Sequence, residues 1–529
     1  MKIKLLFLGL FCATVAFGQM QNLENLAEGK MVYGSILYDS NSKVYGYFYL
    51  FERDKNKEKK TMEYVFLDKN LNKASNNTFT CNSYNESNFE YIGIKSIYAD
   101  CTLMGDYVIL NKFFYYYGVM GNIFVPLVSS FQMISLKDKT VSAEFKYENG
   151  TFTELPLDGS QLKKENKKTQ IKYMISACNK GDNKGFFITQ EDMSGQNFKE
   201  KDLKFFDENR NLKWTYTYNP DGTNKDYRTS SILYSNNNNI YFLEIWQRKG
   251  KAKEYHIVCL DFQTGRKKYD YLFENENSRF SHTLRVKEVK GQLVLAGNYS
   301  EYNKDKEFEL DKNLGFFKII LDTLGKEQVH TYSKWSDFKG AIDVDERGRV
   351  EKDFRLRPTK FFFLEDGTIS ILTEKFKAQS LGVWLPIPIV GSIVQAATAS
   401  GEKSTDFVLF NMNKDFASNS VKTIKKQFTE AYGGTYDYLF SQYINDDNGA
   451  VFFYKDFVKK KDSKEQKEDQ WILGINSIIN GELTEEKIPI SSKKNYVIEP
   501  MPAKEGYILL REYNKKEKYD QIRLEKLNY

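Results

Sequence analysis

Short apolar runs bounded by turn residues recur along the chain, for example at 185–189, 450–454 and 507–510. Such runs, rich in aromatic residues, are typical of β-strands that are buried on both faces. A sheet with one wet face would instead alternate apolar and polar residues. Helical periodicity does not persist beyond a few turns in any window. The pattern therefore predicts an all-β protein.

The predicted strands recur in units of four. In the clearest copy they lie near 231–234, 240–246, 256–261 and 268–273. An asparagine-rich turn precedes the second strand, a charged tip follows it, and a Leu-Asp turn ends the third strand. Turns of this last kind can be placed at eight positions, near Asp68, Asp138, Asp207, Asp261, Asp322, Asn413, Asn476 and Glu525.

Repeated four-stranded units that are buried on both faces predict a β-propeller of seven or eight blades. Two unequal propellers, or an array of β-sandwiches, are the alternatives. The last copy ends after its third strand, at 519–527, and the segment 19–27 precedes the first strand, near 31–38. This segment could supply the missing strand. Alternatively, the last unit is incomplete and the N-terminal tail is loose.

The N-terminus has the features of a secretory signal. Lys2 and Lys4 precede an apolar run at 5–17 that is too short to span a bilayer, and small residues at Ala16 and Gly18 mark a cleavage site. We expect residues 1–18 to be a signal peptide and 19–529 to form a single β-propeller domain with two apolar insertions. The protein would then be exported to a periplasmic or extracellular location. An uncleaved anchor is the alternative.

The charge balance excludes one class of function. The chain has 77 basic and 71 acidic residues, a net charge of +6, and its lysines are scattered among acids in tips such as 54–60. A nucleic-acid-binding protein would cluster basic residues on one face. We therefore expect no nucleic-acid partner.

Four cysteines remain beyond the signal segment: Cys81, Cys101, Cys178 and Cys259. An oxidising compartment permits disulfides among them, but the sequence does not choose between the three pairings of four cysteines. No Cys-x-x-Cys motif or Cys/His cluster indicates a metal site.

No catalytic, cofactor-binding or metal-binding residue can be assigned. The three histidines, His256, His282 and His330, fall in or beside strands of different copies. The segment 343–348 begins like a calcium-binding loop, but Arg347 stands where an oxygen ligand is required, so a turn is expected. There is no phosphate-binding loop and no dinucleotide fingerprint.

Two long uncharged segments stand out, at 113–136 and 378–401, each of 24 residues. Each contains a glycine followed by bulky apolar residues and proline. Each is expected between the second and third strands of its unit, in copies two and six, which lie opposite each other in an eight-bladed ring. We expect the partner-binding residues among them: Phe124, Pro126, Leu127, Trp384, Pro386, Pro388 and Ile389.

Three interpretations of these insertions are open. They could pack together as a structural lid, or form an exposed patch for a protein, glycan or lipid partner, since soluble proteins seldom expose large apolar patches. They could also dip into a membrane. The prolines and internal glycines oppose a spanning helix, so only shallow membrane contact is considered, and no transmembrane span is expected.

The run at 46–51 and the turn at 67–71 give the chain a family likeness. With its Ala-Phe-Gly/Gln signal ending, it resembles large exported proteins of unknown function that are common in Bacteroidota and carry propeller-like repeats. The resemblance implies a periplasmic or extracellular location in a Gram-negative cell, and it brings no catalytic residues.

These observations favour a non-enzymatic propeller that binds an envelope partner through the two insertions. A carbohydrate-active enzyme with carboxylates at the propeller channel is one alternative, since glycosidases need two suitably spaced carboxyl groups. A purely structural repeat protein is the other.

Overall fold

A computed structural model describes most of the chain. The described residues are 20–55, 59–83, 93–117, 124–148, 150–156, 161–162, 164, 173–178, 184–192, 202–219, 226–249, 251–302, 313–351, 353–380, 400–427, 429–432, 437–458, 470–490, 496–514 and 516–528. These residues divide into two compact units, one of residues up to Phe273 together with Lys494–Asn528, and one of Glu274–Lys493.

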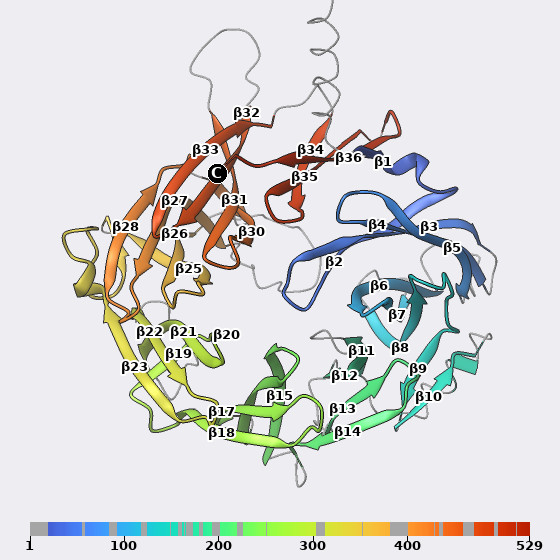
Figure 1. The fold of residues 1–529 in the computed structure, drawn as a ribbon, viewed down its shortest axis with the longest axis horizontal. Helices are drawn as coiled ribbons and strands as arrows, with labels where there is room; N and C mark the ends of the chain where they lie inside the picture. The colour runs from blue at the N-terminus through green and yellow to red at the C-terminus, as the bar shows by residue number, and fades with distance from the viewer. Residues whose placement is uncertain are drawn as a thin grey trace, which may run out of the picture. The chain divides into compact units, whose positions relative to one another are not determined.

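The first unit holds five antiparallel sheets, in which strands that follow each other in the chain are neighbours (Figure 1). The first sheet contains β2 (Lys30–Tyr38), β3 (Val44–Lys55), β4 (Lys59–Asp68) and β5 (Lys73–Asn82). The second contains β6 (Gly93–Met104), β7 (Tyr107–Tyr117), β8 (Phe124–Ser135), β9 (Phe145–Glu148) and β10 (Thr151–Glu154). The third contains β11 (Tyr173–Cys178), β12 (Gly185–Asp192), β13 (Asp202–Asp207) and β14 (Leu212–Thr217). The fourth contains β15 (Asp226–Ser235), β16 (Asn239–Arg248), β17 (Lys251–Asp261) and β18 (Lys267–Asn275).

The remaining sheet of this unit joins both ends of the chain. It contains β34 (Val497–Pro502), β35 (Tyr507–Asn514), β36 (Tyr519–Lys526) and, as its fourth strand, β1 (Met20–Asn22). Met20 pairs with Arg523 and Asn22 with Gln521. The prediction that the N-terminal segment completes the last unit is confirmed. The short helix η1 (Leu23–Asn25) follows β1, and its Leu23 is buried against Leu509 and Ile522.

The second unit holds three sheets. One contains β19 (Phe280–His282), β20 (Arg285–Val289), β21 (Gln292–Glu301), β22 (Asn313–Leu321) and β23 (Glu327–Lys334). The next contains β24 (Arg349–Val350), β25 (Phe354–Phe363), β26 (Ile369–Ser380), β27 (Ser400–Met412), β28 (Ser418–Ile424) and β29 (Thr429–Tyr432). The last contains β30 (Tyr438–Ile444), β31 (Gly449–Val458), β32 (Gln470–Ile479) and β33 (Glu482–Pro489). A short helix, η3 (Trp335–Phe338), follows β23.

The fold class is therefore all-β with eight blades, each built on a four-stranded sheet to which three blades add one or two short strands, a β-propeller, as predicted. The prediction of one domain over 19–529 remains a prediction. Among the described residues, no helix is both long and apolar enough to cross a membrane.

Burial along the strands explains the apolar runs that the sequence shows. The second strand β21 is buried at every residue between its two ends, and in β31 the residues Ala450–Tyr454 are 0% exposed. The fourth strand β33 is exposed along almost its whole length. Second and third strands have a sheet neighbour on both sides and packed side chains on both faces, so they read as continuous apolar runs.

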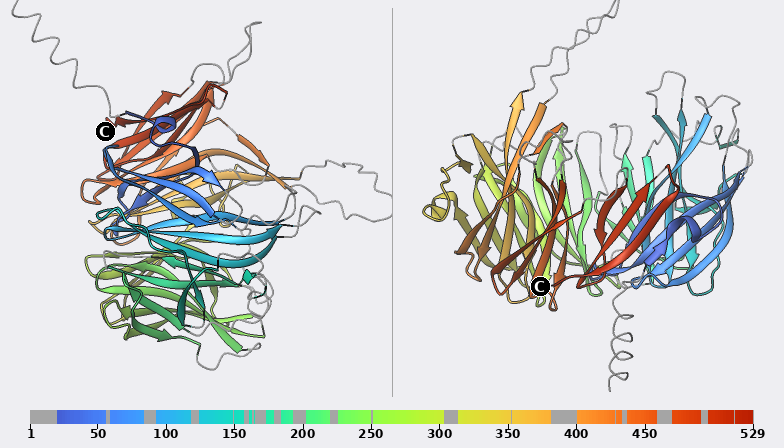
Figure 2. Two further views of the ribbon diagram at one scale, coloured as in Figure 1. Left: turned by 90° about the vertical axis from the view of Figure 1, so that its right-hand side faces the viewer. Right: turned by 90° about the horizontal axis from the view of Figure 1, so that it is seen from above.

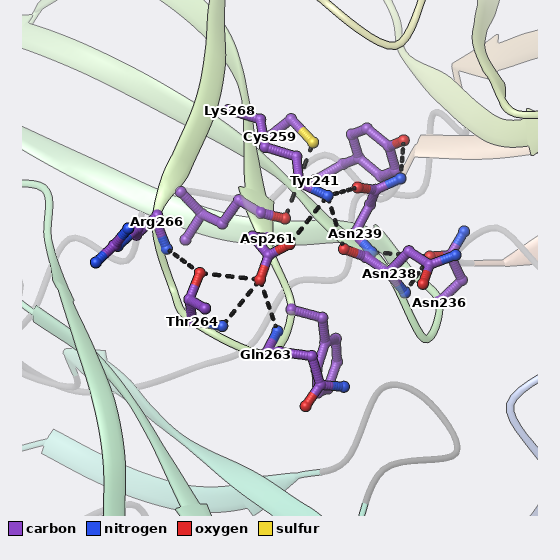
Figure 3. A network of polar contacts seen from close by, with 12 residues as sticks. Asn236, Asn238, Asn239, Tyr241, Cys259, Asp261, Gln263, Thr264, Arg266 and Lys268 are labelled. Atoms are coloured by element: carbon purple, nitrogen blue, oxygen red, sulfur yellow. Dashed lines mark hydrogen bonds and ion pairs between the residues drawn. The ribbon is translucent and has the colours of Figure 1, made fainter.

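The aspartate after the third strand closes a recurrent turn. The Asp68 carboxylate accepts hydrogen bonds from the amides of Asn70 (2.8 Å) and Asn72 (2.9 Å), and Leu71 adopts a φ of 65°. In the equivalent turn, Asp261 accepts from the amides of Gln263 (3.1 Å) and Thr264 (2.9 Å), as Figure 3 shows. A short acceptor that binds its own downstream amides stabilises such a turn, which is why aspartate marks it in the sequence.

Two predicted turns are wrong, because Glu525 lies inside β36, paired with Ile508, and the turn predicted at Asn476 also falls within a strand. Asn476 lies inside β32, is 0% exposed, and pairs with Glu485 of the next strand. The turn lies instead at Asn480 and Gly481, whose φ angles of 52° and 75° are those of a tight hairpin. The sequence around Asn476 offers a polar residue, but the Asn-Gly pair has the conformational freedom that a two-residue turn requires.

Candidate functional site

The first predicted insertion, 113–136, is mostly strand rather than a separate flap. Residues 113–117 belong to β7 and Phe124–Ser135 to β8. Tyr117 pairs with Phe124, so only 118–123, which lie outside the described residues, connect the two strands. The expectation of one long insertion here was wrong, because apolar residues continue without interruption from buried strands into the connection between them.

Three predicted partner-binding residues lie at this end of β8. Phe124 of β8 pairs with Tyr117 of β7, and Pro126 pairs with Tyr115. Leu127 lies where the pairing register between the two strands shifts. The structure thus brings them together with the tyrosines of β7 on one hairpin.

The second predicted insertion, 378–401, begins in β26 and ends in β27. It connects the second and third strands of its blade, as predicted. Pairing of β26 and β27 continues to Ser380 and Ser400, past the end of β25, which pairs with β26 only up to Phe376 (Figure 2). On the other side of the hairpin, β29 pairs with β27 up to Gly401. The predicted site residues Trp384, Pro386, Pro388 and Ile389 lie outside the described residues.

Equivalent hairpins in the first unit have charged ends. The β3–β4 hairpin pairs Lys55 with Lys60, and the β16–β17 hairpin pairs Arg248 with Lys251. The hairpins of β7–β8 and β26–β27 instead approach their connections through uncharged residues. The same topological position therefore carries charged residues in two blades and uncharged residues in two others.

Buried charges, which the sequence analysis missed, lie within the second strands of three blades. Lys112, Glu244 and Glu374 are each the sixth residue of β7, β16 and β26, and they are 2%, 1% and 0% exposed. A charge directly after an apolar stretch, at the sixth position of the strand, is the sequence signal that could have found them.

Lys112 is neutralised below the β7–β8 hairpin. Its Nζ lies 3.0 Å from a carboxylate oxygen of Glu144 and donates to the carbonyl of Asn82 (3.1 Å). The Ser130 hydroxyl donates to the same carboxylate at 2.7 Å. Burial alone would lower the pKa of Lys112, but the Glu144 charge opposes it and the pKa is raised.

Glu374 occupies the corresponding place below the β26–β27 hairpin. Its carboxylate accepts a hydrogen bond from Arg357 (3.1 Å) and lies 3.7 Å from the Lys426 ammonium, which also contacts Asp437. Burial raises the pKa of Glu374, although Lys426 and Arg357 act in the opposite direction. This buried ionic cluster joins β25 and β26 to the connection between β28 and β30.

Glu244 is the centre of a third polar cluster, in the blade of β15–β18. It accepts a hydrogen bond from the Tyr216 hydroxyl at 2.6 Å, and burial raises the pKa of its carboxyl. Beside it, the Trp246 ring is stacked on His256 at 4.2 Å between ring centres, and the Arg228 guanidinium lies 3.8 Å from the Trp246 ring.

A raised pKa is one property of a general acid, and Glu244 has it. Access to a substrate is the second property, and the position of Glu244 does not provide it. A general acid must reach the substrate within hydrogen-bonding distance. Glu244 is 1% exposed and one carboxylate oxygen is already bound by Tyr216, so this carboxyl stabilises the blade rather than facing a ligand.

The three histidines lie in strands, but in two blades rather than the three that were expected, because β19 and β23 belong to the same sheet. His256 contacts Asp270 (2.7 Å) and Glu254 (3.0 Å). His282 and His330 each lie 3.0 Å from the hydroxyl of Tyr332. Within the described part of the chain, no group of three or more His, Cys, Asp or Glu could hold a metal ion.

The segment at 343–348 forms a turn, as expected. The Asp345 carboxylate accepts from the amides of Arg347 and Arg349, both at 2.9 Å, and pairs with the Arg349 guanidinium at 2.6 Å. Both carboxylate oxygens of Asp345 therefore bind groups of the turn itself.

Three of the four cysteines are described as free thiols: Cys81, Cys101 and Cys259. Burial raises the pKa of the Cys81 thiol, and raises that of Cys101 to about 11. Burial thus disfavours the thiolate, which is the nucleophilic form, at both positions.

Comparisons with solved structures find matches at low similarity. The WD40 domain of SCAP from fission yeast is 6% identical, with a TM-score of 0.36 and coverage of 96% of this chain and 97% of that one. A polysaccharide lyase of family PL25, an ulvan lyase, is 8% identical, with a TM-score of 0.35 and coverage of 81% and 91%. A europium-containing methanol dehydrogenase is 8% identical, with a TM-score of 0.37 and coverage of 93% and 86%. Similarity at this level carries no functional argument.

Comparison with curated protein sequences gives no match. A family model does match residues 158–528, which is most of the chain. The chain belongs to this family, DUF6770, a family of unknown function.

Proposed function

We propose that this protein is an exported, non-catalytic propeller that binds a component of the cell envelope through the apolar ends of two hairpins. The binding residues are those predicted in the uncharged segments: Phe124, Pro126, Leu127, Trp384, Pro386, Pro388 and Ile389.

One observation carries this proposal. The hairpin between the second and third strands ends in charged residues in the β3–β4 and β16–β17 pairs, but in uncharged residues in the β7–β8 and β26–β27 pairs. A connection without a function is expected to be solvated, as the charged hairpins are, and large apolar patches on soluble proteins mark interaction sites.

The binding test compares a double variant with a matched control. We expect Phe124→Ala with Trp384→Ala to weaken binding of the purified protein to envelope vesicles at least tenfold, because buried aromatic anchors dominate interfaces. Trp471→Ala is the control, since Trp471 is also an exposed aromatic residue (48%) but lies on β32. Binding is measured by co-sedimentation.

Parallel assays separate the three classes of partner. Vesicles of envelope lipids alone, vesicles treated with protease, and free envelope glycans are tested with the same variants. If the double variant binds every preparation as the wild type does, the proposal is wrong. Unchanged binding together with a lowered melting temperature would support the structural lid instead.

Export rests on the sequence of residues 1–18 and on the resemblance to exported Bacteroidota proteins. We expect the protein from the native cell envelope to begin at Gln19, because the small residues Ala16 and Gly18 precede that bond. N-terminal sequencing after cell fractionation measures this. A cytosolic protein that begins at Met1 would contradict it.

A further inference from the structure

Two histidines and a tyrosine meet in the blade that contains β19–β23. His282 Nε2 and His330 Nε2 each lie 3.0 Å from the hydroxyl oxygen of Tyr332. His282 lies on β19 and the other two residues lie on β23, at the opposite edge of the same sheet. All three belong to the second unit. The two imidazole nitrogens are therefore gathered around one oxygen atom.

The strand register places these side chains on one face of the sheet. His282 lies opposite Tyr299 of β21, two residues from Gly297 on the same strand. Gly297 lies opposite Phe317 of β22, and Phe317 lies opposite Tyr332. Directly opposed residues share a face, and so do residues two apart on one strand. A Cβ atom at Gly297 would lie 2.9 Å from the Phe317 ring, so glycine leaves this face open.

A carboxylate contacts the other ring nitrogen of each histidine. His282 Nδ1 lies 3.4 Å from a Glu274 oxygen, and His330 Nδ1 lies 3.2 Å from a Glu327 oxygen. Since a carboxylate accepts hydrogen bonds, each Nδ1 carries a proton, and a neutral imidazole then directs the lone pair of Nε2 at Tyr332. A carboxylate on one ring nitrogen, with the other nitrogen turned to an ion, is the arrangement that orients metal-binding histidines.

The single proton of the Tyr332 hydroxyl cannot serve both histidines. It reaches the lone pair of one Nε2 at a time, and the other Nε2 then faces the oxygen without a hydrogen from this hydroxyl. A cation bound to both nitrogens and to the oxygen removes this conflict, because all three atoms then direct a lone pair at it.

The spacing and the charge around Tyr332 suit such a cation. Bonds from zinc to nitrogen or oxygen are about 2.0–2.2 Å, so neighbouring ligand atoms on one ion lie about 3 Å apart, as the hydroxyl and each nitrogen do. Burial raises the pKa of Tyr332, and the charges of Glu327 and Glu274 raise it further, so the local field favours positive charge. The His330 side chain is 34% exposed, which gives access from solvent.

We infer that His282 Nε2, His330 Nε2 and the Tyr332 oxygen form a binding site for a divalent metal ion of the zinc and copper class, which imidazole ligands suit. The described residues contain no suitable group of three His, Cys, Asp or Glu, and this site differs because tyrosine supplies its third ligand. When the ion binds, the hydroxyl proton of Tyr332 is released to solvent. The site does not depend on the apolar hairpins, so its failure and the failure of the proposed envelope binding are distinguishable.

Calorimetric titration with Zn²⁺ tests the site on the full chain, prepared without a histidine tag. We expect one ion per chain, and His330→Gln and Tyr332→Phe each to weaken binding about tenfold or more, because even the residues that orient metal ligands contribute about 10- to 100-fold. Both variants should fold, since His330 is at the surface and phenylalanine keeps the ring of Tyr332. The control is His256→Gln, which removes a histidine that also contacts two carboxylates, Asp270 and Glu254, and should leave binding unchanged.

Copper identifies the ligand atoms directly. With Cu²⁺ bound, the wild type should show nitrogen couplings from two imidazoles by electron paramagnetic resonance, together with a phenolate-to-copper charge-transfer band. Tyr332→Phe should lose the band, and His330→Gln should lose one nitrogen coupling. The inference is overturned if neither ion binds, in which case a second proton on one imidazole resolves the conflict at Tyr332. It is also overturned if His330→Gln and Tyr332→Phe bind as the wild type does, or if His256→Gln weakens binding as much as they do.

Discussion

Replacing Lys426 by methionine is expected to lower the free energy of unfolding by about 3–5 kcal/mol, the usual cost of removing one partner of a buried ion pair. The Lys426 side chain is 0% exposed and contacts Asp437 and Glu374, whose side chains are 11% and 0% exposed. Its removal takes away the ammonium group that contacts both carboxylates and leaves Glu374 with Arg357 as its cationic partner. Urea unfolding at pH 7 measures the change.

The neighbouring residue provides the control. Lys425 pairs with Asp406 at 3.2 Å, but its side chain is 77% exposed, so Lys425→Met is expected to change stability by about 0–1 kcal/mol. If Lys425→Met and Lys426→Met lower the free energy of unfolding equally, burial does not determine how much an ion pair contributes to stability.

The pH dependence of the Lys426 variant follows from Glu374. Burial already raises the pKa of Glu374, and Lys426 is one of the groups that holds it down. Without Lys426 the folded-state pKa rises further above its unfolded value, so stability is greatest at low pH and falls as the pH rises through that pKa. We therefore expect a smaller defect at pH 5 than at pH 8.

Replacing Trp335 by alanine is expected to destabilise the second unit by about 3–5 kcal/mol. Trp335 begins η3, is 0% exposed, and its indole N–H donates to the Asn313 carbonyl at 3.0 Å. Its ring lies 5.0 Å from that of Phe316 and 5.9 Å from that of Phe410, which belong to adjacent blades. The variant leaves a cavity between the blades and an unpaired carbonyl.

Trp335→Phe separates packing from hydrogen bonding and is expected to cost less than the alanine variant. Trp471→Ala, at an exposed tryptophan, is expected to remain within about 0.5 kcal/mol of the wild type. Thermal unfolding measures all three proteins. A loss for Trp335→Ala no larger than that for Trp471→Ala would contradict the anchoring role of Trp335.

Prediction was most accurate where the information is local. The strand at 240–246 and the turn at Asp261 appear where they were expected, because apolar runs and self-capping aspartates act within a few residues. The turn prediction failed at Asn476, because a buried polar residue within a strand resembles a turn residue in the sequence. The prediction of an insertion failed at 113–136, because the strands and the connection between them have the same apolar composition.

The candidate sites depend on contacts that no local pattern contains. Lys426 reaches Glu374 from the connection after β28, and Lys287 of β20 reaches Asp447, in the turn before β31, although 160 residues separate them in the chain. A charge in an apolar strand signals a polar cluster, as at Glu244, but not the identity of its partners.

By itself, the sequence determined the all-β class, the four-stranded repeat and the uncharged character of the two hairpins, because burial on both faces of a strand dictates its composition. Only the tertiary structure decided that β1 completes the sheet of β34–β36, and which residues compensate the buried charges. The physical reason is that pairing between strands and neutralisation of charge depend on distances in space between residues that are remote in the chain.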